Sequence, residues 1–152
     1  ALKACGEKMK EILNDLDKLN AFHPYCSLDK WIGDARKMGD SPQLKDYYEK
    51  NARNLITTWG GSLNDYASRS WAGLISDYYA KRWEVYIDTF IKAAEKGVEV
   101  DQKQLEDELK EIEEGWVNAT DRKDVRKDIH SVTDGLLSFS TFLFSKYQRL
   151  VK

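Results

Sequence analysis

The sequence predicts an all-α protein, an irregular bundle of about six helices with one long central helix. Apolar residues recur at intervals of three and four along most of the chain, which is the period of amphipathic helices. No stretch alternates apolar and polar residues as a half-buried strand does. Only two prolines interrupt the 152 residues, so long helices are possible.

The first helix is predicted over residues 2–19, where the apolar residues form one narrow stripe. The His-Pro pair at 23–24 ends this region, because a residue before proline disfavours the α conformation. Ser27 can cap a second, short helix that reaches Met38, with Gly39 as its stop. The stripe of the first helix consists of Leu2, Cys5, Met9, Ile12, Leu16 and Leu19.

A third helix is predicted to begin after Ser41, an N-cap residue followed by proline at the first helical position. We expect it to continue to Trp59 and to stop at the glycine pair 60–61.

The long central helix is predicted from about Leu63 to Lys96, with Gly97 as its terminator. Ser62 and Asp65 have the spacing of a capping box in which Asp replaces Glu. Apolar positions recur every four residues in this segment, so the apolar stripe rotates around the helix. Different sides of the helix must therefore be covered along its length.

Asp101 can cap a fifth helix whose apolar residues are Leu105, Leu109, Ile112 and Trp116. Its acidic residues form a charge-rich run with no aromatic floor beside them, so we interpret them as a solvent-exposed face with no catalytic role. A sixth helix is predicted over about 123–147; its apolar run 135–145 is too short to span a membrane and fits a buried helix. The acidic run comprises Glu106, Asp107, Glu108, Glu111, Glu113 and Glu114.

The composition argues against several classes of function. A net charge of −2 provides no field that would attract nucleic acid or an anionic membrane. The two histidines, His23 and His130, are far apart and no metal-ligand motif is present, so we predict no metal and no cofactor. Cys5 lies on an apolar stripe and is expected to be buried; whether it pairs with Cys26 stays open.

The length fits one domain, residues 1–152. The chain begins at Ala1 with neither an initiator Met nor a signal-peptide pattern. We therefore expect it to be a piece of a longer protein.

The segment from Arg53 to Trp83 is unusually dense in Trp, Tyr, Arg and Asp. It reads Arg-x5-Trp-Gly, then Leu-x-Asp-Tyr-Ala, then Ala-Gly-Leu-x-x-x-Tyr-Tyr-x-x-Arg-Trp. This pattern resembles the C-terminal helical domain of α-N-acetylglucosaminidases, glycoside hydrolase family 89. Weaker similarity extends from the start of the chain to about Ile129, and the residues from Thr133 onward depart from the pattern. The matching residues are Arg53, Trp59, Gly60, Leu63, Asp65, Tyr66, Ala67, Ala72, Gly73, Leu74, Tyr78, Tyr79, Arg82 and Trp83.

The resemblance implies a parent enzyme that hydrolyses terminal α-linked N-acetylglucosamine in glycans such as heparan-type chains. Such retaining glycosidases use two carboxylates, which in this family lie on a (β/α)8 barrel N-terminal to the present segment. We therefore expect no catalytic residue here and no hydrolysis by the chain alone. The implied partners are the catalytic barrel of the same protein and the glycan, with no nucleic acid and no membrane. The family is secreted or periplasmic in bacteria and lysosomal in animals.

The resemblance also implies that the helical domain packs on the barrel and forms one wall of the sugar pocket. Such a wall needs flat aromatic faces and a few polar groups. Trp59 can project from a helix end or close the core, and Asp65 can bind a sugar hydroxyl or cap a helix. Arg82 lies within the apolar stripe, so we favour its pairing with a carboxylate of this domain or of the barrel. The candidate substrate-binding or barrel-interface residues are Trp59, Asp65, Tyr66, Trp71, Tyr78, Tyr79 and Arg82.

Tyr78 and Tyr79 are about 100° apart on a helix, so one should pack inward while the other offers its hydroxyl to the pocket or interface. If the barrel normally covers this domain, part of the candidate set should be accessible together on one side of the isolated chain.

Two other interpretations remain open. The chain can be a non-catalytic carbohydrate-binding or protein-interaction module whose aromatic residues form the binding face, or a free-standing bundle whose tryptophans all lie in the core. An upstream barrel with two suitably placed glutamates would distinguish the enzyme from both.

Overall fold

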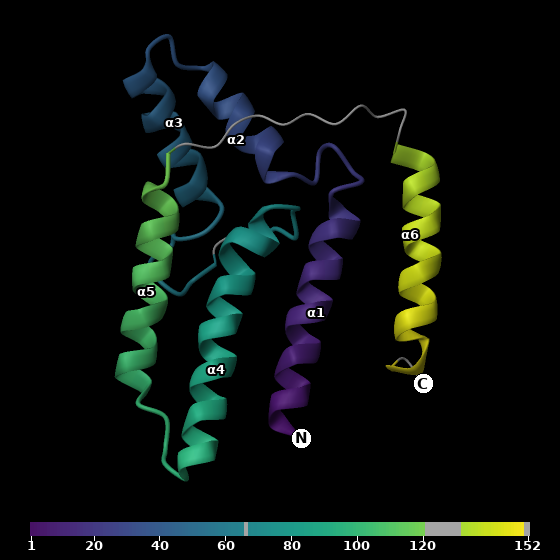
Figure 1. The fold of residues 1–152 in the computed structure, drawn as a ribbon. Coiled ribbons are helices and arrows are strands. Elements are labelled where there is room, and N and C mark those ends of the chain that lie inside the picture. The colour runs from purple at the N-terminus through teal and green to yellow at the C-terminus, as the bar shows by residue number, and fades with distance from the viewer. Residues whose placement is uncertain (66, 121–131, 151–152) are drawn as a thin grey trace.

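The computed structural model describes residues 1–65, 67–120 and 132–150 (Figure 1). These residues form helices and connecting loops without any named strand, which confirms the predicted all-α class. In chain order the elements are α1 (Leu2–Asn20), α2 (Leu28–Lys37), α3 (Pro42–Leu55), the π-helical turn η1 (Ile75–Tyr79), α4 (Ala80–Lys96), α5 (Gln102–Asn118), α6 (Val132–Tyr147) and the 3-10 turn η3 (Gln148–Leu150).

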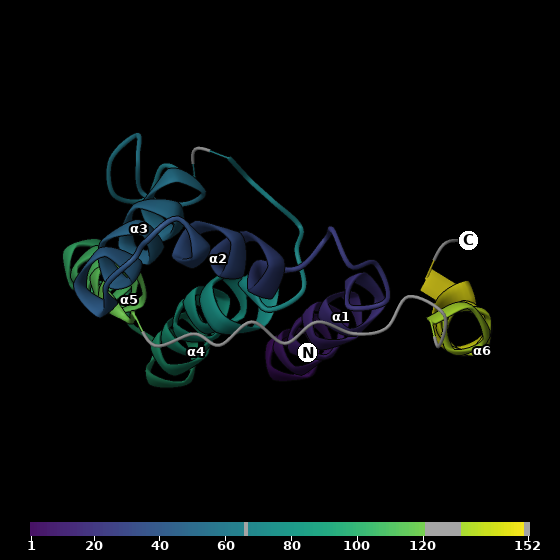
Figure 2. The same cartoon turned by 90° about the horizontal axis from the view of Figure 1, so that it is seen from above.

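The helices form an open row with a second layer over one end. Helices α5, α4, α1 and α6 lie side by side in that order, and α2 and α3 lie across the upper ends of α4 and α5 (Figures 1 and 2). Contacts join α2 to α3, α3 to α5, α5 to α4, α4 to α1 and α1 to α6. The buried core lies where the two layers meet and contains Leu28, Ile32, Ala52, Ile56, Leu74, Tyr78, Trp116 and Val117.

Local signals placed several helix ends correctly. The Ser41 hydroxyl accepts a hydrogen bond from the backbone N–H of Leu44, and the Asp101 carboxylate accepts one from Gln104. Gly97 ends α4 in the left-handed conformation, with φ of 66°. Each of these caps satisfies a backbone group that the helix itself leaves unpaired.

The central helix is shorter than predicted. Residues 63–65 and 67–73 form an irregular segment, and the central helix consists of the π-helical turn η1 from Ile75 followed by the regular helix α4 from Ala80. Ser62 does not cap it, because the Ser62 hydroxyl donates to Glu113 of α5 at 2.5 Å. The prediction that α3 reaches Trp59 is also wrong, since that helix ends with Leu55.

The start of the central helix is fixed by a residue from α1. Asp17 Oδ1 accepts hydrogen bonds from the backbone N–H groups of Gly73 at 2.8 Å and of Ser76 at 3.0 Å. A carboxylate at this end satisfies free N–H groups and complements the helix dipole. The cap comes from 56 residues away in the chain, so local spacing could not reveal it.

Helix α1 approaches α4 closely through Gly6. A Cβ atom at this position would lie 2.5 Å from Ile87 Cγ2, so only glycine fits without movement. Cys5, the preceding residue, is exposed rather than buried as predicted, because it points about 100° away from this contact. Both Cys5 and Cys26 are free thiols.

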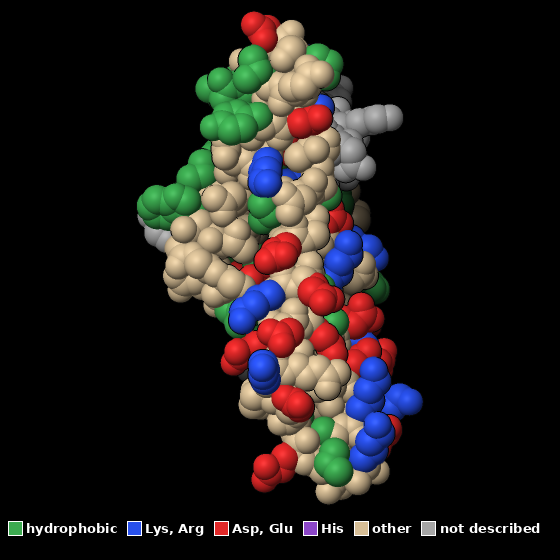
Figure 3. Space-filling model, turned by 90° about the vertical axis from the view of Figure 1, so that its left-hand side faces the viewer, with side chains coloured by type: hydrophobic (Ala, Val, Ile, Leu, Met, Phe, Trp, Pro, Cys, Tyr) green, Lys and Arg blue, Asp and Glu red, His purple; other side chains and the backbone are tan. Residues whose placement is uncertain are grey.

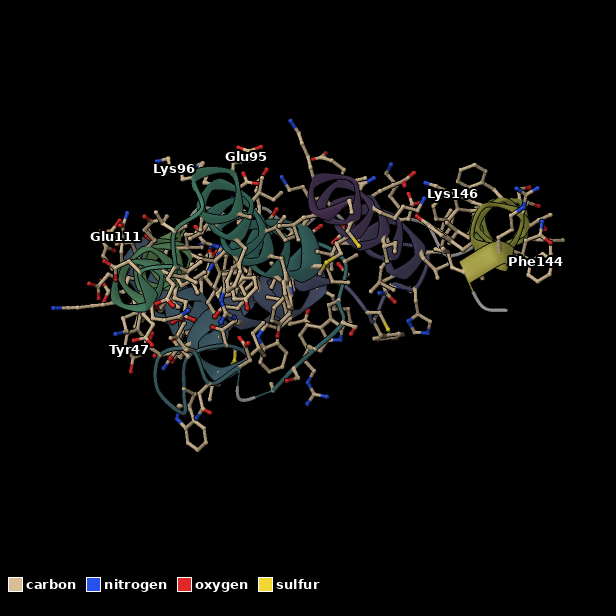
Figure 4. The ribbon with its side chains drawn as sticks, turned by 90° about the horizontal axis from the view of Figure 1, so that it is seen from below. Tyr47, Glu95, Lys96, Glu111, Phe144 and Lys146 are labelled. Carbon is tan, nitrogen blue, oxygen red and sulfur yellow. The ribbon has the colours of Figure 1, made fainter. Side chains whose placement is uncertain are left out.

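Helix α6 is attached to α1 by polar contacts. Lys146 Nζ lies 2.6 Å from Asp15 Oδ2 and 2.5 Å from Glu11 Oε1, and the Tyr147 hydroxyl donates to Asp15 at 2.7 Å. Figure 4 shows Lys146 pointing toward α1, whereas Phe144 points away and is 71% exposed. The prediction that this helix is buried is therefore wrong for its outer side. Residues 123–131, which were also predicted to be helical, lie outside the residues that the structure describes.

The charged contacts shift the pKa values of the groups involved. Burial disfavours the Asp15 carboxylate, but hydrogen bonds from Lys146 and Tyr147 outweigh it, so the pKa of Asp15 lies below its usual value. The hydrogen bonds to Asp15 and Glu11 raise the pKa of Lys146. None of the described helices is both long and apolar enough to cross a bilayer.

We expect Asp15→Asn to loosen α6 from α1. Loss of the charge-assisted hydrogen bonds should lower the free energy of unfolding by about 2 kcal/mol at neutral pH, measured by urea titration. Amide exchange should accelerate in α6 more than in α4. The control is Asp107→Asn, which changes an exposed residue of α5 and should alter stability by less than about 0.5 kcal/mol.

The effect should depend on pH. The folded pKa of Asp15 is below its reference value of 3.8, so the carboxylate stabilises the fold above about pH 4 and loses this contribution as the pH falls through the folded pKa. The difference between the native chain and Asp15→Asn should therefore disappear in strong acid. If the amide exchange rates of α6 in Asp15→Asn at neutral pH equal those of the native chain, Asp15 does not hold α6 on α1.

Candidate functional site

Trp59 begins a short loop after α3, which we call the 59–65 loop (Trp59 to Asp65). The Trp59 backbone N–H donates to Asn54 O at 3.0 Å, and Gly61 N–H donates to Thr58 O at 2.8 Å. The Asn64 side-chain amide closes the loop on itself by donating to Gly60 O at 2.8 Å. These bonds hold the backbone while the Trp59 side chain stays 55% exposed.

The loop is anchored to α5 by Glu113, whose side chain is almost fully buried. Its Oε2 accepts hydrogen bonds from the Ser62 hydroxyl at 2.5 Å and from the Leu63 backbone N–H at 3.1 Å. Its Oε1 faces the central helix, where the Tyr78 hydroxyl donates to it at 3.3 Å and Arg82 Nη2 lies 3.3 Å away. One carboxylate thus joins the loop, α5 and the central helix.

The interpretation of the whole acidic run as a solvent-exposed face is wrong for Glu113. Leu105, Leu109, Glu113 and Trp116 recur at steps of four, four and three, which places Glu113 on the inward face of α5. This spacing was the available sequence signal, and the surrounding acidic residues obscured it.

Arg82 finds its carboxylate partners within this domain. Its Nη1 lies 2.5 Å from Asp65 Oδ1, and its Nη2 contacts Glu113. The guanidinium also lies over the Tyr78 ring, 5.0 Å from the centroid. Asp65 therefore binds Arg82 and does not cap a helix, so the second end of the loop is held by an ion pair.

The same segment contains unusual backbone conformations. Leu63, Asp65 and Ser68 have positive φ values of 62°, 42° and 43°. Non-glycine residues pay about 1–2 kcal/mol each in this region, so the surrounding contacts must hold them there. Glu113 and Arg82 supply two of these contacts.

Tyr78 lies in the core, and Tyr79 packs against the core with its hydroxyl also buried. Tyr78 is 1% exposed, and burial raises the pKa of its hydroxyl. Tyr79 is half-buried and has no side-chain hydrogen-bond partner among the described residues. The two rings meet edge to face, with centroids 5.1 Å apart.

Tyr79 helps to line a pocket of about 200 Å³ beside the ion pair. Trp83 and Tyr86 form its aromatic side, and their side chains are 42% and 40% exposed. The candidate set from the sequence did not include these two residues, although Trp83 belongs to the recognised pattern. The complete lining is Asp65, Tyr79, Arg82, Trp83, Tyr86 and Leu109.

The candidate residues do not form one exposed surface. Asp65, Tyr78 and Arg82 gather around Glu113, whereas Trp71 is half-buried against Trp31 of α2, with ring centroids 5.7 Å apart. Among the described candidates only Trp59 is exposed, and Tyr66 lies outside the described residues. Within the described parts of the chain, no three His, Cys, Asp or Glu side chains are placed to hold a metal ion.

Comparison with known proteins identifies the family. A family model described as the alpha-N-acetylglucosaminidase (NAGLU) C-terminal domain matches residues 1–137. The chain belongs to this family. A curated relative, the alpha-N-acetylglucosaminidase of Homo sapiens, is 31% identical over 123 residues, which cover 80% of this chain and 17% of the relative.

Many residues of the α-N-acetylglucosaminidase C-terminal pattern have a structural task here. Arg53 is buried; its Nε and Nη2 donate to Glu49 at 2.9 and 2.6 Å, and its Nη1 donates to Trp116 O at 3.1 Å. The family match ends within α6, so Lys146 and its contacts to α1 lie beyond it. The pattern therefore combines core residues with the anchored loop.

We expect Arg82→Met to destabilise the domain by about 3 kcal/mol, because removing one partner leaves buried carboxylate charge uncompensated. The measurement is denaturant unfolding followed by circular dichroism. In a double-mutant cycle with Glu113→Gln, the double variant should lose less stability than the sum of the single variants. Strict additivity of the two losses would show that Arg82 and Glu113 do not depend on each other.

Proposed function

We propose that this chain is the C-terminal domain of a larger α-N-acetylglucosaminidase and that the 59–65 loop forms part of the wall of its sugar pocket. The family supports the first part, since the named relative is an alpha-N-acetylglucosaminidase. The observation that carries the second part is Trp59, a tryptophan that is 55% exposed on a loop held in place by a buried carboxylate.

An exposed tryptophan on a rigid support is suited to bind a sugar. The indole face can stack on the C–H surface of a pyranose ring, and a fixed loop loses little conformational freedom on binding. Gly61 near Trp59 leaves room for a ring to approach, since a Cβ atom there would have nothing within 4 Å. The loop would thus orient the terminal N-acetylglucosamine and exclude water from one side of it.

The catalytic barrel would cover the side of the domain formed by α3 and the loop that follows it. Figure 3 shows hydrophobic side chains gathered toward the upper left, while the lower part of this face carries acidic and basic side chains together. Exposed apolar residues of α3 and its loop include Leu44, Tyr47, Leu55 and Trp59. Exposed apolar side chains that cluster in this way commonly mark a contact surface.

The chemistry would remain on the barrel. Retaining glycosidases place two carboxyl groups about 5–5.5 Å apart across the scissile bond. The carboxylates that meet in this domain, Glu113 and Asp65, instead bind Arg82 and backbone or hydroxyl groups, and Glu113 is buried. They are therefore suited to hold the wall in place and not to transfer protons to a substrate.

We expect Trp59→Ala in the full-length enzyme to lower kcat/KM for an aryl α-N-acetylglucosaminide about tenfold, since a lost stacking contact of about 1.4 kcal/mol corresponds to that factor. Stability should change little because the side chain is mostly exposed. The matched control is Phe144→Ala, which removes an exposed aromatic side chain from the outer side of α6 (Figure 4). An unchanged kcat/KM in Trp59→Ala would reject the pocket wall.

The chain alone is expected to hydrolyse no aryl α-N-acetylglucosaminide, whereas the full-length protein does so. Turnover by the purified 152-residue chain at an enzyme-like rate would show that its own residues catalyse the reaction.

The pocket lined by Trp83 and Tyr86 favours one alternative, a carbohydrate-binding module without catalysis. Titration of the chain with N-acetylglucosamine, followed by NMR, distinguishes the two. Saturable chemical-shift changes in the native chain that Trp83→Ala abolishes would support the carbohydrate-binding module. The absence of such changes would favour the pocket wall.

A further inference from the structure

We propose that Glu113 is a positioning residue for the sugar pocket: it touches no substrate, and it holds the 59–65 loop in the conformation that presents Trp59. The inference rests on the proposed function of this loop. It assigns a specific task to a residue of α5 that lies 51 positions along the chain from its partner Ser62.

The two carboxylate oxygens of Glu113 accept from two sets of donors that overlap at Leu63. Oε2 accepts from the Ser62 hydroxyl, and the Leu63 N–H is shared between the oxygens, 3.1 Å from Oε2 and 3.2 Å from Oε1. Oε1 also meets the central helix through Tyr78 and Arg82. Both sides present donors, so the site requires an acceptor at each oxygen, which an ionised carboxylate provides.

Other contacts hold the two ends of the loop. At its start the Trp59 N–H donates to Asn54 O of α3 at 3.0 Å, and the Asn64 amide bond to Gly60 O lies within the loop. At its other end Asp65 forms an ion pair with Arg82, and Arg82 is itself bound by Glu113. The contacts that the described residues Ser62, Leu63 and Asp65 make with the helices therefore involve Glu113 directly or through Arg82.

The loop also contains strained backbone conformations. Leu63, which donates its N–H to Glu113, has a φ of 62°, and Asp65 has a φ of 42°. Such conformations persist only where surrounding contacts determine them. Without the carboxylate, these residues should relax toward negative φ, and Trp59 would lose its fixed orientation.

Glu113→Gln tests this with the smallest change of shape. An amide has one acceptor oxygen and one donor group, so its NH2 group replaces either Oε2, which Ser62 and Leu63 contact, or Oε1, which Leu63 and Arg82 contact. In each orientation the Leu63 N–H keeps only one of its two acceptors. Glu114→Gln is the matched control, because Glu114 is the next residue of α5 and is exposed.

The first readout is amide exchange in the 152-residue chain. We expect the exchange of Leu63 N–H to accelerate about tenfold or more in Glu113→Gln, with smaller changes in the amides of α1 and α6. Glu114→Gln should leave the amide exchange rates of the 59–65 loop unchanged. A folded Glu113→Gln chain whose Leu63 amide stays as protected as in the native chain overturns the inference.

The second readout is kinetic and uses the full-length enzyme. A displaced wall weakens sugar binding, so KM for an aryl α-N-acetylglucosaminide should rise about threefold or more while kcat changes less. A merely structural role of Glu113 would lower the amount of folded enzyme and leave KM as it is. That second result overturns the inference.

Comparison with Trp59→Ala separates this inference from the proposed function. If Trp59→Ala impairs binding and Glu113→Gln does not, the pocket wall stands and the positioning role of Glu113 is rejected. If Glu113→Gln loosens the loop while both variants keep the native KM, the pocket wall itself is rejected, and Glu113 anchors a loop that the substrate does not meet. If Glu113→Gln unfolds the chain, Glu113→Asp, which keeps the charge but retracts it by one methylene, should give the same rise in KM.

Discussion

The arrangement of this domain depends on the buried carboxylate of Glu113. A charge removed from water is tolerated only when partners surround it, because its desolvation costs several kcal/mol. Glu113 meets that condition with a hydroxyl, a backbone N–H, a tyrosine and a guanidinium, contributed by the loop and the central helix. The loop and the central helix provide the donors that the carboxylate needs. Because both bind the same carboxylate, their separation is fixed.

The same principle recurs where other helices meet. Asp17 of α1 caps the central helix, Asp15 holds α6, and Glu49 of α3 binds Arg53 and Arg36. The buried apolar cluster is confined to the region where the two layers meet, and the long row of helices extends beyond it (Figure 1). Hydrogen-bonded carboxylates are directional, so they define how neighbouring helices are oriented where apolar packing is limited.

The candidate site could be predicted only in part from the sequence. The aromatic and glycine pattern located the segment, and the position of Arg82 within an apolar stripe indicated a paired cation. The identity of its partners, Asp65 and Glu113, came from the structure, because ion pairs across elements have no fixed spacing in the chain. Trp59 and Tyr78 show the same limit: both are aromatic residues of one pattern, yet one is exposed and the other is buried.

The sequence by itself determined the helical class, the family and those helix ends whose caps are local, such as Ser41, Asp101 and Gly97. Those features depend on residues within a few positions of one another, where propensity and side-chain capping act. Tertiary structure decided the late start of the central helix, the burial of Glu113 and the outward side of α6. Each of these depends on a partner more than 50 residues away, and which side chains meet across such distances is set by the packing of whole helices.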